Sequence, residues 1–293
     1  MDNLLNIIKS YNIIGFGECS HGQQKINEFR FKVFKELVRK YKFNTIVLEE
    51  NYDLCYLINN YIQTGKGNIK SILNDCYHPW QSIIMLKIIK WMRKWNINNN
   101  TKLKFIGIDA IDKSSYQVNK VSLHTNTYKY WKKLIKNNKS RDYNMYLMFK
   151  KLYNIRDKYF IIAHNDHLRN KSLSPREFSH IKNNAHDAFG QYISKYYKKN
   201  YYCIANTFNK GYYRALDPKK EYKLVNVSAK NYCSFDKKFQ NEEYMFIDRN
   251  KVKTYDNLKI KSCTGIKNNI DCTKINAFNG ILLLDNETPL ISY

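Results

Sequence analysis

Two periodicities of apolar and polar positions alternate along the chain. Short apolar runs rich in β-branched residues predict buried strands, and apolar side chains that recur every three or four positions predict amphipathic helices. The predicted strands are 11–16, 43–48, 103–108, 158–163, 201–208, 244–248 and 278–285. The predicted helices are 26–39, 52–63, 80–95 and 184–198, and a lysine- and tyrosine-rich stretch over 120–156 is mostly helical in pattern.

The order of these elements predicts the fold class. Strands that alternate with helices are typical of an α/β protein with a mainly parallel central sheet and helices on both faces. We expect one domain over residues 1–293. Within it, residues 110–157 form a helical insert and residues 217–293 form a C-terminal part that completes the sheet.

Charged or ionisable side chains follow four of the predicted strands. The segments are GECSHG at 17–22, EEN at 49–51, DA at 109–110 and HNDH at 164–167. In open α/β sheets, ligands bind at the carboxyl ends of the strands. The sequence therefore predicts a functional site built from these four segments.

The loop GFGECSHG at 15–22 stands where a phosphate-binding loop would stand. A dinucleotide fingerprint requires a third glycine where this chain has Ser20, and the Gly-Lys-Ser/Thr ending of a P-loop is missing. Glu18 would also repel a phosphate at the helix N-terminus. These differences argue against a nucleotide site. A carboxylate beside an imidazole, Glu18 and His21, instead indicates a general base whose tautomer is fixed.

The second histidine pair allows two kinds of chemistry. His164 and His167 follow a buried strand and can turn toward one point. Two imidazoles with a carboxylate such as Glu18 or Glu49 suit zinc or iron. The same histidines could instead donate hydrogen bonds to a developing oxyanion. The sequence by itself leaves both alternatives open.

Arg30 interrupts the apolar side of the first long helix, next to Phe29 and Phe31. A buried arginine has to be paired with an anion. We expect its partner to be Glu18 or Glu49. A snorkelling surface arginine is the alternative.

Composition narrows the class of protein. The hydrophobic fraction of 43% is that of a globular chain. The net charge of +25 is spread along the chain, and Lys, Asn, Ile and Tyr are enriched together, as AT-rich codons would produce. We therefore expect a solvated lysine surface rather than a nucleic-acid site.

The cysteines and the apolar segments indicate in which cellular compartment the protein is expected. The seven cysteines form no CxxC pair, which argues against a disulfide framework and favours a reducing compartment. A signal peptide and a run of about 20 apolar residues are not apparent, so we expect a cytoplasmic protein without a membrane partner. Cys19 lies two residues from His21 and is a weaker candidate nucleophile, for which a plain loop thiol is the alternative that we favour.

Five motifs and a closing segment, in this order, resemble the erythromycin esterase family over nearly the whole chain. They are Gly17-Glu18-Cys19-Ser20-His21-Gly22, Arg30 nine residues after the histidine, Leu48-Glu49, Gly107-Ile108-Asp109, Ala163 to His167, and FNGILLLDNETPL at 278–290. Members of this family include esterases that open the lactone ring of macrolide antibiotics. The resemblance implies an erythromycin esterase-like α/β fold and a hydrolase activity on a small-molecule ester, such as a lactone or a macrolide-like ring.

The resemblance also implies roles for individual residues. His21 would be the base that activates water. The other implied groups are carboxylates that orient the base or bind a metal, histidines that polarise the carbonyl, and an arginine that holds the carboxylates: Glu18 and Glu49, His164 and His167, and Arg30. No cofactor would be required, unless a divalent metal such as zinc is held by Glu18, His21, Glu49, His164 and His167.

One departure from the family leaves the substrate open. The stretch between Asp109 and Ala163 is much shorter than in the macrolide esterases, where a helical region there helps to form the substrate cleft. Two alternatives to a water-activating esterase follow. One is a metal-dependent hydrolase of esters or peptides, and the other is a binding protein that kept the fold without catalysis.

Overall fold

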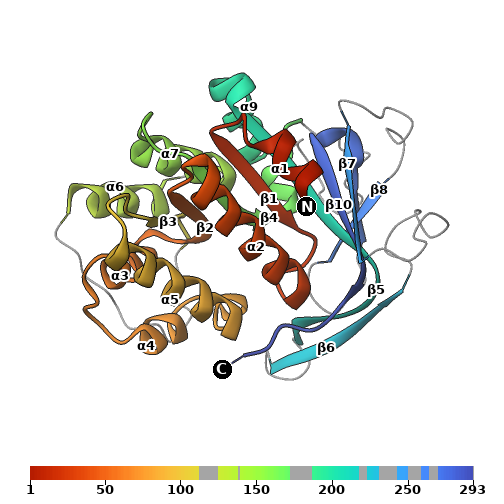
Figure 1. Ribbon diagram of the computed structural model, residues 1–293, viewed down its shortest axis with the longest axis horizontal. Coiled ribbons are helices and arrows are strands. Elements are labelled where there is room, and N and C mark those ends of the chain that lie inside the picture. Colours follow the sequence, from red (N-terminus) through yellow and green to blue (C-terminus); the bar gives the residue numbers. More distant parts are fainter. Residues whose placement is uncertain are drawn as a thin grey trace. The chain divides into compact units, whose positions relative to one another are not determined.

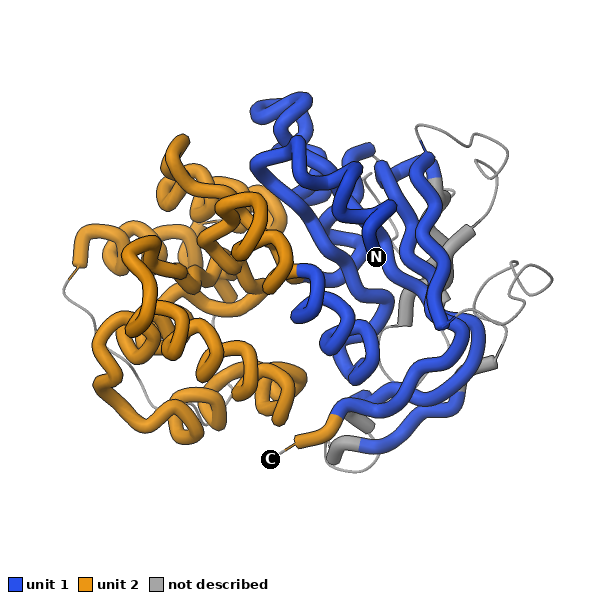
Figure 2. Tube along the Cα trace, viewed as in Figure 1, with its two compact units in different colours: residues 1–33, 163–290 blue, residues 34–162, 291–293 orange. Residues whose placement is uncertain are grey.

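Most strands of the computed structural model run parallel, and the fold is α/β, as the order of elements predicts (Figure 1). The structure describes residues 1–111, 125–137, 139–171, 187–217, 223–230, 243–249, 259–263 and 270–292. The chain divides into two compact units (Figure 2). Unit 1 comprises Met1–Val33 and Ala163–Leu290, and unit 2 comprises Phe34–Ile162 and Ile291–Tyr293.

Unit 1 holds strands in the order β1-β5-β10-β7, and β6 pairs with the far half of β5. Both β1 and β10 lie parallel to β5, whereas β7 is antiparallel to β10. Every residue of β1 is buried, which fits its continuous apolar run. The strands are β1 (Ile13–Glu18), β5 (Tyr201–Asp217), β6 (Lys223–Lys230), β7 (Tyr244–Asp248) and β10 (Gly280–Glu287), with a separate pair β8 (Lys259–Cys263) and β9 (Ile270–Lys274).

Two helices of unit 1 begin close to strand ends. Directly after the histidine loop, Cys19–Gln23, α2 begins, and α8 follows β4 without a break. The helices are α1 (Asp2–Ile8), the first part of α2 (Gln24–Tyr41), α8 (Asn165–Leu168) and α9 (Phe189–Tyr197). This arrangement places ionisable loop residues at the carboxyl ends of buried strands.

Unit 2 contains parallel pairings of β2 with β3 and with β4. The side chains of Ser82, Thr125 and Ser140 accept N–H groups at the starts of α5, α6 and α7, as N-cap residues do. Gly65 ends α3 in the left-handed conformation. The elements are β2 (Thr45–Asn51), α3 (Tyr52–Thr64), α4 (Ile69–Asn74), α5 (Ile83–Asn98), β3 (Lys104–Asp109), α6 (Asn126–Ile135), α7 (Arg141–Leu152) and β4 (Tyr159–His164), whose last two residues belong to unit 1.

Several elements differ from the sequence prediction. Strand β5 continues to Asp217, well past the predicted end at residue 208, because β6 pairs with its far half. The described part of the stretch over 120–156, which is predicted to be mostly helical, contains α6 and α7. The parts of predicted helices at 120–124 and 184–186 lie outside the described residues.

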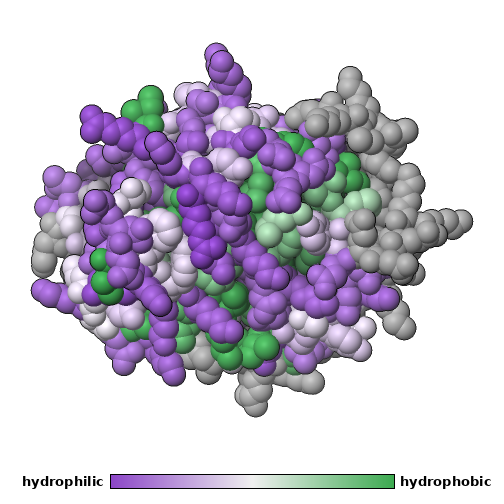
Figure 3. Space-filling model, viewed as in Figure 1, coloured by the Kyte–Doolittle hydropathy of each residue, from purple (hydrophilic) through white to green (hydrophobic). Residues whose placement is uncertain are grey.

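The surface is largely polar on the face shown in Figure 3, where hydrophilic residues surround isolated apolar ones. In the part of the chain that the structure describes, no helix has the length and apolar character that a membrane span requires.

Candidate active site

A glutamate–histidine pair forms at the end of β1. The Glu18 side chain is fully buried, and its Oε1 lies 2.6 Å from Nδ1 of His21. The His21 side chain is 22% exposed. The carboxylate therefore belongs to the interior while part of the imidazole reaches solvent, which is the arrangement a base needs to meet a substrate.

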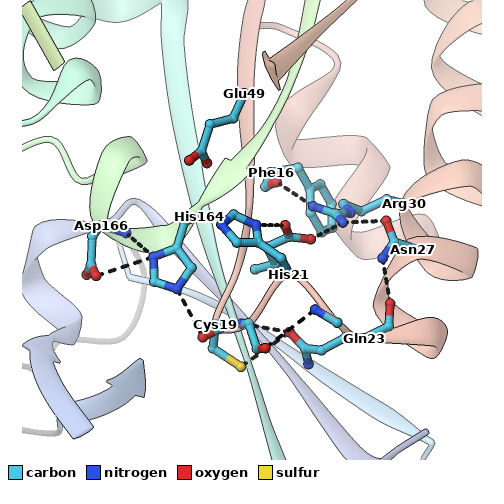
Figure 4. Close-up of polar contacts among 12 residues, drawn as sticks. Phe16, Cys19, His21, Gln23, Asn27, Arg30, Glu49, His164 and Asp166 are labelled. Carbon is cyan, nitrogen blue, oxygen red and sulfur yellow. Dashed lines mark hydrogen bonds and ion pairs between the residues drawn. The ribbon is translucent and has the colours of Figure 1, made fainter. Parts of the chain in front are cut away.

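Arg30 holds the other oxygen of this carboxylate (Figure 4). Its side chain is 1% exposed and its Nη2 donates to Glu18 Oε2 and, over 2.6 Å, to Asn27 Oδ1. Its Nη1 donates to the carbonyl of Phe16 over 3.4 Å. Of the two partners that the sequence suggested for Arg30, the structure shows Glu18.

The Glu18 carboxyl is ionised in this environment. Burial opposes its charge, but the Arg30 guanidinium and the hydrogen bond from His21 outweigh burial and lower the pKa of Glu18. Because an ionised carboxylate only accepts hydrogen bonds, Nδ1 of His21 carries the proton. Nε2 of the neutral ring therefore presents a lone pair, as a general base requires.

His164 caps α8 and holds the histidine loop (Figure 4). Its Nε2 donates to the carbonyl of Cys19 over 3.1 Å, and its Nδ1 accepts the backbone N–H of Asp166 over 3.4 Å. Nδ1 also lies 3.3 Å from Oδ2 of Asp166, so both ring nitrogens of His164 face partners within the protein. Its ring centroid lies 5.3 Å from that of His21, so the structure brings these two predicted residues together.

His167 lies in the last turn of α8 and is partly buried. The role that the family resemblance implies for it stays a prediction.

The thiol of Cys19 is buried inside the loop. Its Sγ donates to Gln23 Oε1 over 3.4 Å, and the same oxygen accepts the backbone N–H of Ser20 over 3.1 Å. Reactive cysteines are at least partly exposed. The geometry agrees with a plain loop thiol.

Glu49 belongs to a charge cluster in unit 2 that the sequence analysis missed. Arg141, at the start of α7, donates from Nη2 to Glu49 over 2.8 Å and to Asp109 over 2.6 Å, and from Nε to Asp109 over 3.1 Å. Burial works against the Arg141 charge, but the two carboxylates raise its pKa. One guanidinium therefore joins the carboxylates that end β2 and β3.

We expect Arg141→Gln to destabilise the protein by about 1–3 kcal/mol, because two buried carboxylates lose charged hydrogen bonds and repel each other. We expect a smaller loss of unfolding free energy than for a fully buried ion pair, because the Arg141 side chain is 39% exposed. Urea unfolding measures the change. Arg141→Lys, which keeps the charge, should lose less. Equal stability of Arg141→Gln and the native protein would contradict this assignment.

Two of the predicted metal ligands, Glu18 and His164, are already bonded within the protein. Among the described residues, no cluster of three or more His, Cys, Asp and Glu side chains has an arrangement that could hold a metal ion. Both oxygens of Glu18 are bonded to His21 and Arg30, and both ring nitrogens of His164 are bonded within the protein. Free lone pairs are what metal binding requires of such ligands.

The family of the chain follows from comparison with known proteins. The erythromycin esterase family model matches residues 38–127 and 112–263. The match spans more than half of the chain, so this protein belongs to the erythromycin esterase family, as its motifs predict. The matched residues include Glu49 and the histidine pair but begin after the histidine loop. No curated protein matches the sequence.

Solved structures match over nearly the full length. A Bacillus cereus protein has 18% identity and a TM-score of 0.78, and the alignment covers 99% of this chain and 92% of that one. A succinoglycan biosynthesis protein has 16% identity and a TM-score of 0.76, with 99% and 91% covered. A variant of the erythromycin esterase EreC, in its open conformation, has 14% identity and a TM-score of 0.68, with 98% and 93% covered. At these identities the likeness establishes the fold.

Proposed function

We propose that the protein hydrolyses carboxylic esters and that His21 activates the attacking water. Membership of the erythromycin esterase family supports an ester hydrolase. The observation that carries the proposal is the buried, arginine-paired Glu18 that accepts a hydrogen bond from His21 Nδ1. This contact leaves Nε2 of a partly exposed ring as the proton acceptor.

The proposed reaction needs one proton carrier. Nε2 of His21 takes a proton from water as the water oxygen attacks the ester carbonyl. The imidazolium that forms is stabilised by the Glu18 carboxylate, whose charge is in turn balanced by Arg30. The tetrahedral intermediate then expels the alkoxide, which takes the proton from Nε2. The products are a carboxylic acid and an alcohol, and the base returns to its starting state.

The proposed substrate is a small-molecule ester, with a lactone as one form. In a lactone the acid and alcohol stay in one molecule, and the same proton transfers open the ring. The dispersed positive charge fits a lysine surface better than a nucleic-acid site.

A panel of esters tests this function. The purified protein, without a histidine tag, is assayed with p-nitrophenyl acetate, with small lactones and with a macrocyclic lactone. We expect at least one class to be hydrolysed about 100-fold or more faster than in buffer, within the range a positioned base supplies. A panel on which the protein has no effect would refute the proposal and favour the non-catalytic binding protein.

Metal content separates this mechanism from the metal-dependent alternative. Since the oxygens of Glu18 and the nitrogens of His164 are already bonded, we expect plasma mass spectrometry to find far less than one metal ion per chain. Chelator treatment should leave the rate unchanged. Near-stoichiometric metal in the native protein that is lost in His164→Ala/His167→Ala would establish the metal-dependent alternative instead.

A further inference from the structure

Glu287, the last residue of β10, is a buried carboxylate that receives four N–H groups. Its Oε1 accepts from the backbone of Lys25 over 2.6 Å and of Thr288 over 2.9 Å. Its Oε2 accepts from the backbone of Ile26 and from Gln23 Nε2, each over 3.2 Å. The residue is 1% exposed. The end of the chain is thus bonded to the start of α2.

The same segment holds the backbone of the histidine loop. These contacts come from Glu287–Leu290, the last four residues of the closing segment at 278–290. The N–H of Leu290 donates to the carbonyl of Gly22 over 3.0 Å, and the N–H of Gln24 donates to the carbonyl of Thr288 over 2.9 Å. Gly22 also accepts the N–H of Arg214 over 2.9 Å, and a side chain at Gly22 would overlap the backbone of Arg214. A glycine is therefore required there.

Both neighbours of His21 are fixed through this segment. On one side, Ser20 donates its N–H to Oε1 of Gln23, and Nε2 of Gln23 in turn donates to Glu287. On the other side, Gly22 is bonded to Leu290. Ser20 and Gly22 set the direction in which the His21 ring leaves the backbone.

The four donors explain why a carboxylate stands at this place. An amide has one acceptor oxygen, and its NH₂ group would face two N–H donors. A helix N-terminus also favours a negative charge. Burial raises the pKa of Glu287 to about 7, so the charged group is costly to keep here.

We propose that Glu287 is a positioning residue for His21, acting through Gln23 and the closing segment. The inference rests on the proposed role of His21 as the base. Glu287 does not touch the reacting atoms. It holds the loop so that His21 Nδ1 stays 2.6 Å from Glu18, which keeps the proton of the neutral ring on Nδ1. A purely structural clamp between β10 and α2 is the alternative.

Glu287→Gln tests the proposal, with Asp248→Asn as a matched control. Asp248 is 8% exposed, accepts the hydroxyl of Tyr202 over 3.1 Å, and pairs with the first residue of β10 rather than the last. Two properties are measured on each full-length variant. One is the ¹⁵N shifts of the His21 ring nitrogens, and the other is kcat and KM for the best ester of the panel.

We expect Glu287→Gln to lower kcat about 10- to 100-fold with little change in KM, because a small displacement of a catalytic group has an effect of that size. The His21 shifts should move in the same variant and stay unchanged in Asp248→Asn. Native His21 shifts and native kcat in a folded Glu287→Gln variant would overturn the proposal.

The test still decides the proposal if Glu287→Gln does not fold or if the native protein hydrolyses no ester. If Glu287→Gln does not fold, Gln23→Ala removes the same link from the other side and should show the same changes. Unchanged His21 shifts and unchanged kcat there would overturn the proposal. If the native protein hydrolyses no ester, the proposed function fails. The His21 shifts then still decide whether Glu287 positions the ring.

Discussion

His21→Ala should lower kcat/KM for the best ester substrate by about 10²–10⁴, the range over which general bases act. The loss follows from the geometry, since Nε2 of His21 is the only proton acceptor that the proposed mechanism uses. Thermal stability should change little, because the His21 side chain is partly exposed and Glu18 keeps its bond to Arg30. Steady-state kinetics and thermal unfolding measure the two effects.

A second histidine provides the control for that experiment. His78 lies in a short 3-10 helix of unit 2 and contacts the ring of Tyr77. His78→Ala should retain native turnover. Activity that survives in His21→Ala would show that another group activates the water, and the proposed mechanism would then be wrong.

Arg30→Met should destabilise the protein by about 3–5 kcal/mol, because it leaves the buried Glu18 charge without its ion-pair partner. Methionine keeps much of the side-chain volume, so the loss reports charge more than packing. Urea unfolding near neutral pH measures it. The double variant Arg30→Met/Glu18→Gln removes the unpaired charge and should recover part of the stability. No recovery would show that packing, rather than charge, explains the loss.

Arg30→Met should reverse the direction in which Glu18 makes the stability of the protein depend on pH. In the native protein the pKa of Glu18 is lowered, so its contribution is present above the unfolded-state value and is lost as pH falls through the folded-state value. Without Arg30, burial is opposed by His21 alone, and we expect the pKa of Glu18 to rise. Arg30→Met should therefore lose stability as pH rises from about 5 to about 8. An unchanged pH profile would contradict the assigned cause of the shift.

The sequence predicts much of the fold because buried strands and amphipathic helices leave local patterns. The apolar run of β1 and the spacing of α2 locate the loop between them, and the loop chemistry singles out Glu18 and His21. That Arg30 pairs with a carboxylate is also predictable, since a charged side chain on an apolar helix face needs an anion, but the sequence left the choice between Glu18 and Glu49 open.

Other parts of the site depend on contacts between residues far apart in the sequence, which a local sequence pattern does not predict. Arg141 stands 32 residues from Asp109, and Glu287 stands 264 residues from Gln23. Their partners are set by the pairing of strands and by loops that follow from it. The closing motif that contains Glu287 is visible in the sequence, but its four N–H partners appear only when β10 lies beside β5. The far half of β5 was missed for the same reason, because its partner β6 defines it.

The ¹⁵N shifts of the His21 ring nitrogens test the central claim most directly, because they report the base without requiring a substrate. In protein with ¹⁵N-labelled histidine, His21→Ala assigns the signals. We predict that the neutral ring shows a protonated Nδ1 and an unprotonated Nε2, since the buried Glu18 carboxylate accepts the hydrogen bond from Nδ1. A neutral ring protonated at Nε2 would have no lone pair for water, and it would contradict the account of this site.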